Sequence, residues 1–375
     1  MRLGLLAAAI SGFVFLLACG DRAPAGLRPA GLAACGSAPM LTRPPIADAD
    51  NPEIAPLGNL NPTGHVFPTD HVYMAVAQSE GVPRSVPVVA PGDVVISVVT
   101  RTSYGGTRSY PEDYGLAFAS CNDVVFVFAH VRALDPSLAA RVGAFGGDCQ
   151  TYSTGNDHVE QCRKAVEIGV HAGDPLGAAG GSGVFSLDFG AYDRRHPVSF
   201  VDPARSSGID QRYTVCPLDY FDAASRTSMT AKLGRRGKKR TVEPRCGTIA
   251  QDVPGTAQGR WFHGPALQDD PHLALVHDNV DPSLGVFSVG TSIPSLPAGT
   301  YAFAPTSAGS FNRNFDGLTA DGVVYCYDTD VPARRRIVVQ LVSATRLRIE
   351  GGPADSRCGD PSTWQLSSGA VQFTR

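Results

Sequence analysis

One short stretch of the chain places a serine and an aspartate at a spacing that could build a polar site. Residues 170–192 are rich in glycine, and within them Ser186-Leu187-Asp188-Phe189 alternates polar and apolar side chains. Because successive side chains of a β-strand point to opposite faces, we expect Leu187 and Phe189 to pack in a core. Ser186 and Asp188 would then face a cavity or solvent, where a carboxylate can bind a cation and a hydroxyl can donate a hydrogen bond.

Two histidines and a second aspartate stand next to other expected strands. His65 and Asp70 precede the alternating segment 71–76, which we expect to be a strand. His130 lies near the end of the second strand of a hairpin that we expect around residues 121–123. Histidine and aspartate together can ligate a divalent metal or transfer protons.

Parts of the chain resemble the lysostaphin/LytM-type zinc endopeptidases, which cut peptidoglycan cross-bridges. Residues 170–190 match that family's "VxxGDxIGxxGxTG…HLHFE" segment. Residues 85–101 resemble its strand-turn-strand "PVxAPxDGxVxxV", and residues 128–131 resemble its "YxHL" segment. The resemblance covers the chain from about Leu57 to Gly190, and it implies an antiparallel β domain with a duplicated hybrid motif.

The resemblance also implies a set of site residues, with one departure from the family. His65 and Asp70 are similar to the family's His-x-x-x-Asp metal motif, but one extra residue separates them, which makes His71 a rival to His65. Where the family has His-Leu-His, this chain has Ser186-Leu187-Asp188. The implied metal ligands are His65, Asp70 and Asp188, and the implied catalytic positions are His130 and Ser186.

The implied cofactor is one divalent metal ion. Catalytic zinc needs three protein ligands and an open position for water. One histidine with two aspartates neutralises the ion, so a bound water would be less acidic than in a site with two histidines. Oxygen ligands also shift the preference from zinc towards harder ions such as calcium, magnesium or manganese. The alternative to a metal site is a polar remnant that lines an old cleft.

The substitutions separate two possible functions. Ser186 can donate a hydrogen bond but cannot act as a base near neutral pH, so one proton-transferring group of the family is missing. We therefore expect a degenerate endopeptidase domain that binds peptidoglycan or its peptides, or that regulates another envelope hydrolase. The alternative is an active metal-dependent peptidoglycan hydrolase with an altered His/Asp/Asp site. The sequence leaves open whether the chain is an enzyme.

A second resemblance is weaker. The pattern V-x-A-G-D-x-L-G over residues 170–177 also occurs in the biotinyl/lipoyl hybrid-motif modules of carriers and efflux adaptors. A carrier needs a lysine at its hairpin tip, and residues 170–192 contain none. The sequence also lacks the pattern of the long helical hairpin of an adaptor. The LytM-type resemblance is therefore preferred.

The N-terminus predicts export and a lipid anchor in the cell envelope. An apolar run ends in Leu-Leu-Ala before Cys19, the pattern of a lipoprotein signal over residues 1–19. A transmembrane helix is the alternative, but the run is shorter than the roughly 20 residues that a span needs. Residues 20–54, rich in alanine, proline and glycine, would form a flexible spacer on the periplasmic or cell-surface side. The formal net charge of −3 gives no field that gathers nucleic acid, so we expect no nucleic-acid partner.

The remaining cysteines predict disulfides. The chain has nine cysteines, so eight remain when Cys19 is set aside, and no two of them form a Cys-x-x-Cys pair. In an exported protein this favours disulfides over metal thiolates. Sequence alone does not fix their connectivity. Closeness along the chain suggests Cys149 with Cys162, Cys216 with Cys246 and Cys326 with Cys358, which leaves Cys35 and Cys121.

The chain divides into two expected domains of mainly β structure. Residues 55–224 would form the LytM-like domain, with a short helix near 135–141 that Asp135 caps. Residues 225–250 contain the basic run 235–240 and would form a linker; the alternative is a surface for anionic polymers or lipid headgroups. Residues 251–375 show repeated short alternating segments, which predict an all-β sandwich or small barrel.

Overall fold

The computed structural model describes residues 29, 31–106, 110–154, 157–181, 183–205, 211–266, 268–330 and 334–375. The predicted signal segment 1–19, Cys19 and the start of the predicted spacer lie outside the described residues. The described chain is mainly β, as the sequence predicts, with two α-helices, α1 (Pro136–Val142) and α2 (Ala223–Thr230). No helix in this part of the chain is long and apolar enough to cross a membrane. Asp135 caps α1 by accepting the Ser137 N–H at 2.9 Å, as expected.

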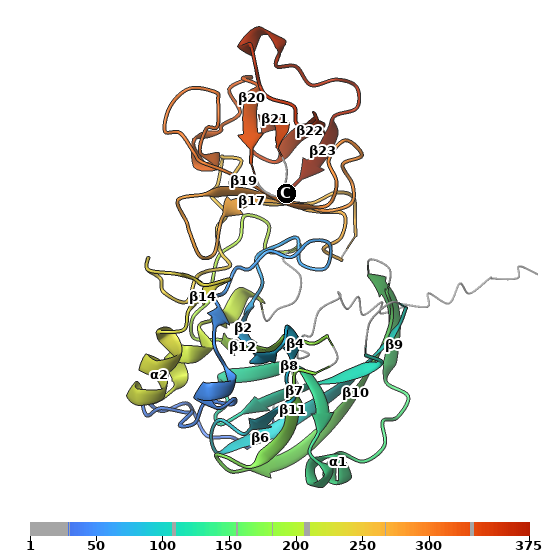
Figure 1. Ribbon diagram of the computed structural model, residues 1–375, viewed down its shortest axis with the longest axis vertical. Coiled ribbons are helices and arrows are strands. Elements are labelled where there is room, and N and C mark those ends of the chain that lie inside the picture. The colour runs from blue at the N-terminus through green and yellow to red at the C-terminus, as the bar shows by residue number, and fades with distance from the viewer. Residues whose placement is uncertain are drawn as a thin grey trace, which may run out of the picture.

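The first folded region is built on an antiparallel 11-stranded sheet (Figure 1). Its main path runs through β1 (Ile54–Ala55), β2 (His71–Ala75), β12 (Ser186–Asp193), β8 (Val124–Leu134), β7 (Glu112–Ala119), β6 (Val94–Gly105), β10 (Asp157–Val170) and β9 (Cys149–Thr154). The other strands of the sheet are β5 (Val86–Val89) and β11 (Pro175–Ala179), which pair with each other, and β13 (Thr214–Val215), which pairs with β12. The neighbours β2, β12 and β8 carry most of the predicted site residues.

Several short elements lie outside this sheet. They are the hairpins β3 (Gln78–Ser79) with β4 (Val82–Pro83) and β14 (Gly234–Arg235) with β15 (Lys238–Lys239), and the 3-10 helices η1 (Asp48–Asp50), η2 (Gln211–Tyr213), η3 (Pro217–Tyr220), η4 (Phe315–Gly317) and η5 (Pro361–Thr363).

Apolar alternation decides which face of the central strands is buried. Leu187 and Phe189 of β12 are 0 % exposed and lie in the main core, together with Val72 and Met74 of β2. Full burial of one such side chain stabilises the fold by about 1.5–3 kcal/mol. The opposite face of both strands is left for polar residues, which confirms the alternation predicted for Ser186 to Phe189.

The predicted spacer is wrong for its later residues, which belong to the folded region. Leu41 and Ile46 are buried in the main core, and Cys35 is bonded to Cys121. The Leu41 N–H also donates to the Tyr220 carbonyl at 3.1 Å. Low overall hydrophobicity suggested a spacer, but these few apolar residues are enough to hold the segment against the sheet.

The residues predicted to form a basic linker are also folded. Arg235 and Lys238 of the β14–β15 hairpin form ion pairs with Asp278 at 3.2 Å and Asp281 at 2.5 Å. Arg240 is buried, and its guanidinium donates to the Asn279 carbonyl at 2.9 Å. The linker interpretation is wrong, because the run is a structured connection between the two folded regions. The surface for anionic ligands stays a prediction, since Arg236, Lys238 and Lys239 are exposed.

The C-terminal module consists of two antiparallel four-stranded sheets at one end of the long axis (Figure 1). Leu273 and Phe287 of one sheet lie in the same buried cluster as Ile337 and Phe373 of the other, the arrangement of a β-sandwich. The strands are β16 (Gly259–Trp261), β17 (Leu273–His277), β18 (Gly285–Val289) and β19 (Gly299–Phe303), then β20 (Tyr325–Thr329), β21 (Arg335–Ser343), β22 (Arg346–Ala354) and β23 (Val371–Thr374).

Four disulfides are present: three join the predicted pairs, and the fourth joins the two cysteines that were left over. A disulfide restricts the unfolded chain and typically stabilises a protein by about 2–4 kcal/mol. The bonds are Cys35–Cys121, Cys149–Cys162, Cys216–Cys246 and Cys326–Cys358.

Candidate functional site

Strand register brings predicted site residues to one face of the large sheet. On one side of β12, Asp188 lies opposite Tyr73 of β2, and Gly190 lies opposite His71. On the other side, Asp188 lies opposite Ala129 of β8. Side chains of directly opposed residues share a face of a sheet. His71, Tyr73 and Asp188 therefore project from the same face.

A bulge in β8 orients His130. Phe128 pairs with Leu116 of β7 and Val131 pairs with Tyr114, so three residue steps along β8 correspond to two along β7. Within this segment His130 has φ 62°, in the left-handed region that residues other than glycine rarely occupy. Its Nδ1 lies 2.6 Å from Oδ2 of Asp113, a β7 residue that is 1 % exposed. The bulge and the ion pair together fix the direction of the imidazole.

Asp188 is the centre of a buried ion-pair network. Its Oδ2 lies 3.3 Å from His71 Nε2 and 3.5 Å from His130 Nε2. Its Oδ1 accepts a hydrogen bond from Ser186 Oγ at 3.1 Å. His71 Nδ1 in turn lies 3.1 Å from Asp70 Oδ1. Carboxylates and imidazoles thus alternate through five residues, which we call the Asp188 network: Asp70, His71, Asp188, His130 and Asp113.

The charges at the centre of this network stabilise one another. Burial disfavours the charged form of His71, but the oxygen atoms of Tyr73 and Asp188 raise the pKa of His71 well above its usual value. Burial likewise disfavours the charged form of Asp188, but His71 and His130 hold the pKa of Asp188 below its usual range. His71 and Asp188 therefore form an ion pair near neutral pH.

His65 lies beside the Asp188 network. Its backbone exchanges two hydrogen bonds with Asn61, at 2.9 and 3.0 Å, which close the loop that carries it. The ring meets the ring of His71 edge-on, with 5.5 Å between the centroids. Burial, and then the charge of His71, lowers the pKa of His65 to about 4. His65 is therefore a neutral imidazole at neutral pH.

The C-terminal module holds the loop that carries His65. Phe67, two residues further on, stacks on the ring of His272 at a centroid distance of 5.3 Å. The Phe67 N–H donates to Oδ2 of Asp269 at 3.4 Å. Leu60 and Phe67 also share a small buried cluster with Phe262 of the C-terminal module. The position of His65 thus depends on residues about two hundred positions later.

The donors of the network suit a metal ion in kind. Metal-binding histidines usually hold one ring nitrogen on a carboxylate and present the other to the ion. His71 and His130 do hold Nδ1 on Asp70 and Asp113 and turn Nε2 towards Asp188. The buried His71 Nε2 also makes no hydrogen bond of good geometry, so its contact with Asp188 is ionic.

The spacing of the donors suits a metal ion in part, because the two imidazole–Asp188 distances of 3.3 and 3.5 Å are those of neighbouring ligands, but three donors do not form one close set there. Across the described residues, the one set of three donors that all lie within 4.8 Å of one another is Cys149, Glu160 and Cys162. The two sulfurs of that set form a disulfide and are not thiolate ligands. Neither the predicted ligands His65, Asp70 and Asp188 nor His71, His130 and Asp188 form such a set among the described residues. A bound metal remains a prediction.

Sequence reasoning found most of this site and missed one member. The predicted residues Asp70, His130, Ser186 and Asp188 come together, and His71, named from sequence as a rival to His65, takes a central place. Asp113 was missed. The signal was present, because the hairpin predicted around residues 121–123 places residue 113 almost opposite residue 130.

The arrangement can hold and redistribute protons, but its groups are largely occupied by one another. The side chain of His130 is 22 % exposed and that of His71 is 13 % exposed, so both imidazoles are partly accessible to solvent. Comparison with known protein families finds no matching family model, and comparison with curated proteins and with solved structures finds no match either.

Proposed function

We propose that this chain is an exported protein of the cell envelope that binds peptidoglycan or its peptides through a degenerate LytM-like domain and does not cut them. The observation that carries this proposal is the position of Asp188 between His71 and His130. The carboxylate compensates the charge that these imidazoles carry when protonated. The network is thus complete without an ion or a substrate.

Hydrolysis requires groups that this network does not offer. A metallopeptidase centre presents three donors to one ion and leaves an open position for the attacking water. Here Nε2 of His71 and Nε2 of His130 both face Oδ2 of Asp188. Ser186 Oγ donates a hydrogen bond to the other oxygen of the same carboxylate. A serine in this position does not remove a proton from water near neutral pH.

The cysteine content supports an exported protein. Four disulfides form and persist in oxidising compartments, and they are rare in the cytosol. The lipoprotein pattern that ends at Cys19 is separate support for export and for a lipid anchor. A tethered binding domain can hold the envelope and the membrane together, or it can bring a separate hydrolase to its substrate.

A second function has one observation in its favour. Asp70 contacts Nδ1 of His71, and Asp113 contacts Nδ1 of His130. Carboxylates orient metal-binding histidines in the same way. A metal-dependent peptidoglycan hydrolase would use this arrangement, with Asp188 as an oxygen ligand. A metal would supply a nucleophilic water at neutral pH.

Sedimentation with insoluble peptidoglycan tests the proposed function. The mature protein, with its disulfides intact, is mixed with purified sacculi, and the pellet and the soluble fragments are analysed separately. We expect the protein in the pellet and no release of soluble muropeptides, with or without added zinc, manganese or calcium.

The His130→Ala variant is the matched control for this experiment. Binding without release in both proteins supports the proposal. Release by the unaltered protein that disappears in His130→Ala would establish the hydrolase instead. Failure of both proteins to sediment would reject peptidoglycan binding.

A further inference from the structure

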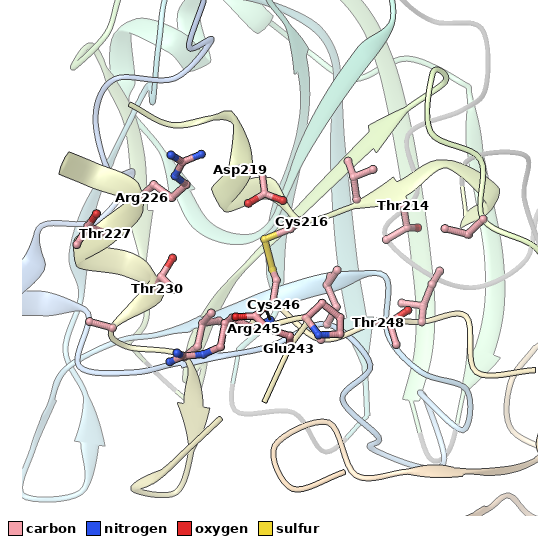
Figure 2. Close-up of a pocket in the computed structure, with 18 residues that line it drawn as sticks. Thr214, Cys216, Asp219, Arg226, Thr227, Thr230, Glu243, Arg245, Cys246 and Thr248 are labelled. Atoms are coloured by element: carbon pink, nitrogen blue, oxygen red, sulfur yellow. Dashed lines mark hydrogen bonds between the residues drawn. A yellow bond between two sulfur atoms is a disulfide. The ribbon is translucent and has the colours of Figure 1, made fainter. Parts of the chain in front are cut away.

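A second polar region lies away from the Asp188 network, in a pocket of about 800 Å³ beside α2 and η3. Figure 2 shows the Cys216–Cys246 disulfide in the middle of this pocket. Arg226 and Thr230 of α2 lie on one side of the disulfide, and Thr248 lies on the other. The volume is within the range of roughly 300–1,000 Å³ that is usual for small-molecule sites.

The wall of this pocket is part of the main core. Leu57, Leu233 and Ile249 line it and are 3 %, 1 % and 2 % exposed. They belong to the same buried cluster as the central strands of the large sheet. The disulfide and this cluster make the wall rigid, so the pocket exists before any ligand arrives.

Four charged side chains line the pocket, and none of them forms a salt bridge in the described part of the chain. They comprise two guanidinium groups and two carboxylates, with Arg226 and Asp219 held on α2 and η3. One carboxylate oxygen of Glu243 accepts the backbone N–H of Arg245 at 2.8 Å, and Arg245 Nε is buried without a hydrogen-bond partner. We call this region the charged pocket; its charged residues are Asp219, Arg226, Glu243 and Arg245.

Charges of both signs around one apolar wall select the charge of a ligand. A simple anion would satisfy the guanidinium groups but would face two carboxylates. A simple cation would satisfy the two carboxylates but would face the two guanidinium groups. A molecule with an ammonium group and a carboxylate can pair with both, through charge-assisted hydrogen bonds that are stronger than neutral ones.

We propose that the charged pocket binds a short zwitterionic peptide, with its ammonium group on Asp219 and Glu243 and its carboxylate on Arg226 and Arg245. The apolar wall and the threonine hydroxyls then contact the peptide between its two ends. This site is separate from the Asp188 network, so it does not depend on the proposed binding of peptidoglycan by that network.

Three related dipeptides test the proposal on the unaltered protein. Calorimetric titration compares alanyl-alanine with its N-acetylated form, which lacks the ammonium group, and with its C-terminal amide, which lacks the carboxylate. We expect alanyl-alanine to bind at millimolar concentration or below. We expect each modification to weaken binding by at least about tenfold, the effect of losing one charge-assisted contact.

Variants then assign each end of the peptide. Asp219→Asn is expected to reduce the penalty for acetylation, and Arg245→Gln the penalty for amidation, because each removes one of the two partners of the missing group. Lys239→Gln, an exposed change on β15 away from the pocket, is the control and should leave all three affinities unchanged. Thermal unfolding checks that each variant is folded.

The result that overturns the proposal is equally direct. Equal affinity for the three dipeptides, or no binding of any of them at millimolar concentration, shows that the charged pocket does not select a zwitterion. Selective binding that Asp219→Asn and Arg245→Gln leave unchanged places the ligand elsewhere and also rejects the site.

Discussion

Charged side chains are paired with one another in the Asp188 network, whereas those of the charged pocket form no salt bridge with any described residue. In the network, the carboxylates of Asp113 and Asp188 are 1 % and 3 % exposed, and each contacts an imidazole. In the pocket, Asp219 and Arg226 face solvent and no salt bridge joins them. The network contains or contacts the two positions for which the family resemblance implies catalysis, whereas the pocket contains, of the predicted site residues, only the pair Cys216 and Cys246.

The difference shows how much of a site is available to a ligand. A ligand that binds a charge in the Asp188 network must separate a buried ion pair, which leaves the second charge uncompensated at a cost of several kcal/mol. A ligand of the charged pocket separates no ion pair within the described residues, and Asp219, Arg226 and Glu243 are already exposed to water. Strong internal pairing therefore favours a structural and orienting role, whereas unpaired charges on a rigid wall favour recognition.

The largest expected effect compares the same substitution in the two regions. Asp188→Asn leaves His71 and His130 without their shared carboxylate, so we expect the free energy of unfolding to fall by about 3 kcal/mol. Asp219→Asn removes no ion pair, and we expect a change within about 0.5 kcal/mol. Urea unfolding with intact disulfides measures both. Equal losses in the two variants would remove the distinction between the regions.

A smaller effect should depend on pH. The pKa of His71 is raised above its unfolded value of 6.5, so its stabilising contribution is complete below that pH and is lost as the pH rises through the folded value. The pKa of Asp188 is lowered from 3.8, so its contribution is lost only as the pH falls below that value. Between pH 3.8 and pH 6.5 we expect His71→Gln to lower the free energy of unfolding by about 2 kcal/mol. At alkaline pH we expect a smaller loss.

The matched control for this pH dependence is His171→Gln. The side chain of His171 is 87 % exposed, and its partner Asp93 is 78 % exposed. Urea unfolding across the pH range should therefore give curves for His171→Gln and the unaltered protein that run in parallel. A cost of His71→Gln that stays constant into alkaline pH would show that His71 does not act through its charge.

The smallest expected effect concerns Ser186. Ser186→Ala removes the hydrogen bond to Asp188 Oδ1, and we expect a loss of about 1 kcal/mol in the free energy of unfolding. The position of the urea transition measures it. Binding to peptidoglycan should not change, because the serine donates inward to the network. A loss of binding without a loss of stability would instead assign Ser186 to the ligand.

Local pattern predicted the strands that carry the site. Period-2 alternation was enough to place Leu187 and Phe189 in the core and Asp188 on the polar face, because a strand has only two faces. The mainly β class and three of the disulfide pairs were predicted for similarly local reasons, whereas Cys35 and Cys121, 86 residues apart, were only the cysteines left over. The extent of the folded region was not, because Leu41 contributes to a core that is formed by residues far along the chain.

Contacts between distant strands could not be predicted in the same way. The choice between His65 and His71 depends on the pairing of β2 with β12, which places His71 Nε2 on Asp188. The orientation of His130 depends on a one-residue bulge that no local pattern announces. The charged pocket was not predicted, because the disulfide and α2 bring together residues that are unremarkable in sequence.

The metal content of the purified protein tests the central claim most directly, namely that the Asp188 network compensates its own charge. The protein is dialysed against a chelator, exposed to zinc, manganese or calcium, freed of unbound ions and analysed by mass spectrometry of the metals. We predict far less than one ion per chain, and no difference between the unaltered protein and Asp188→Ala. One tightly bound ion per chain that is lost in Asp188→Ala would contradict the claim and establish a metal centre at Asp188.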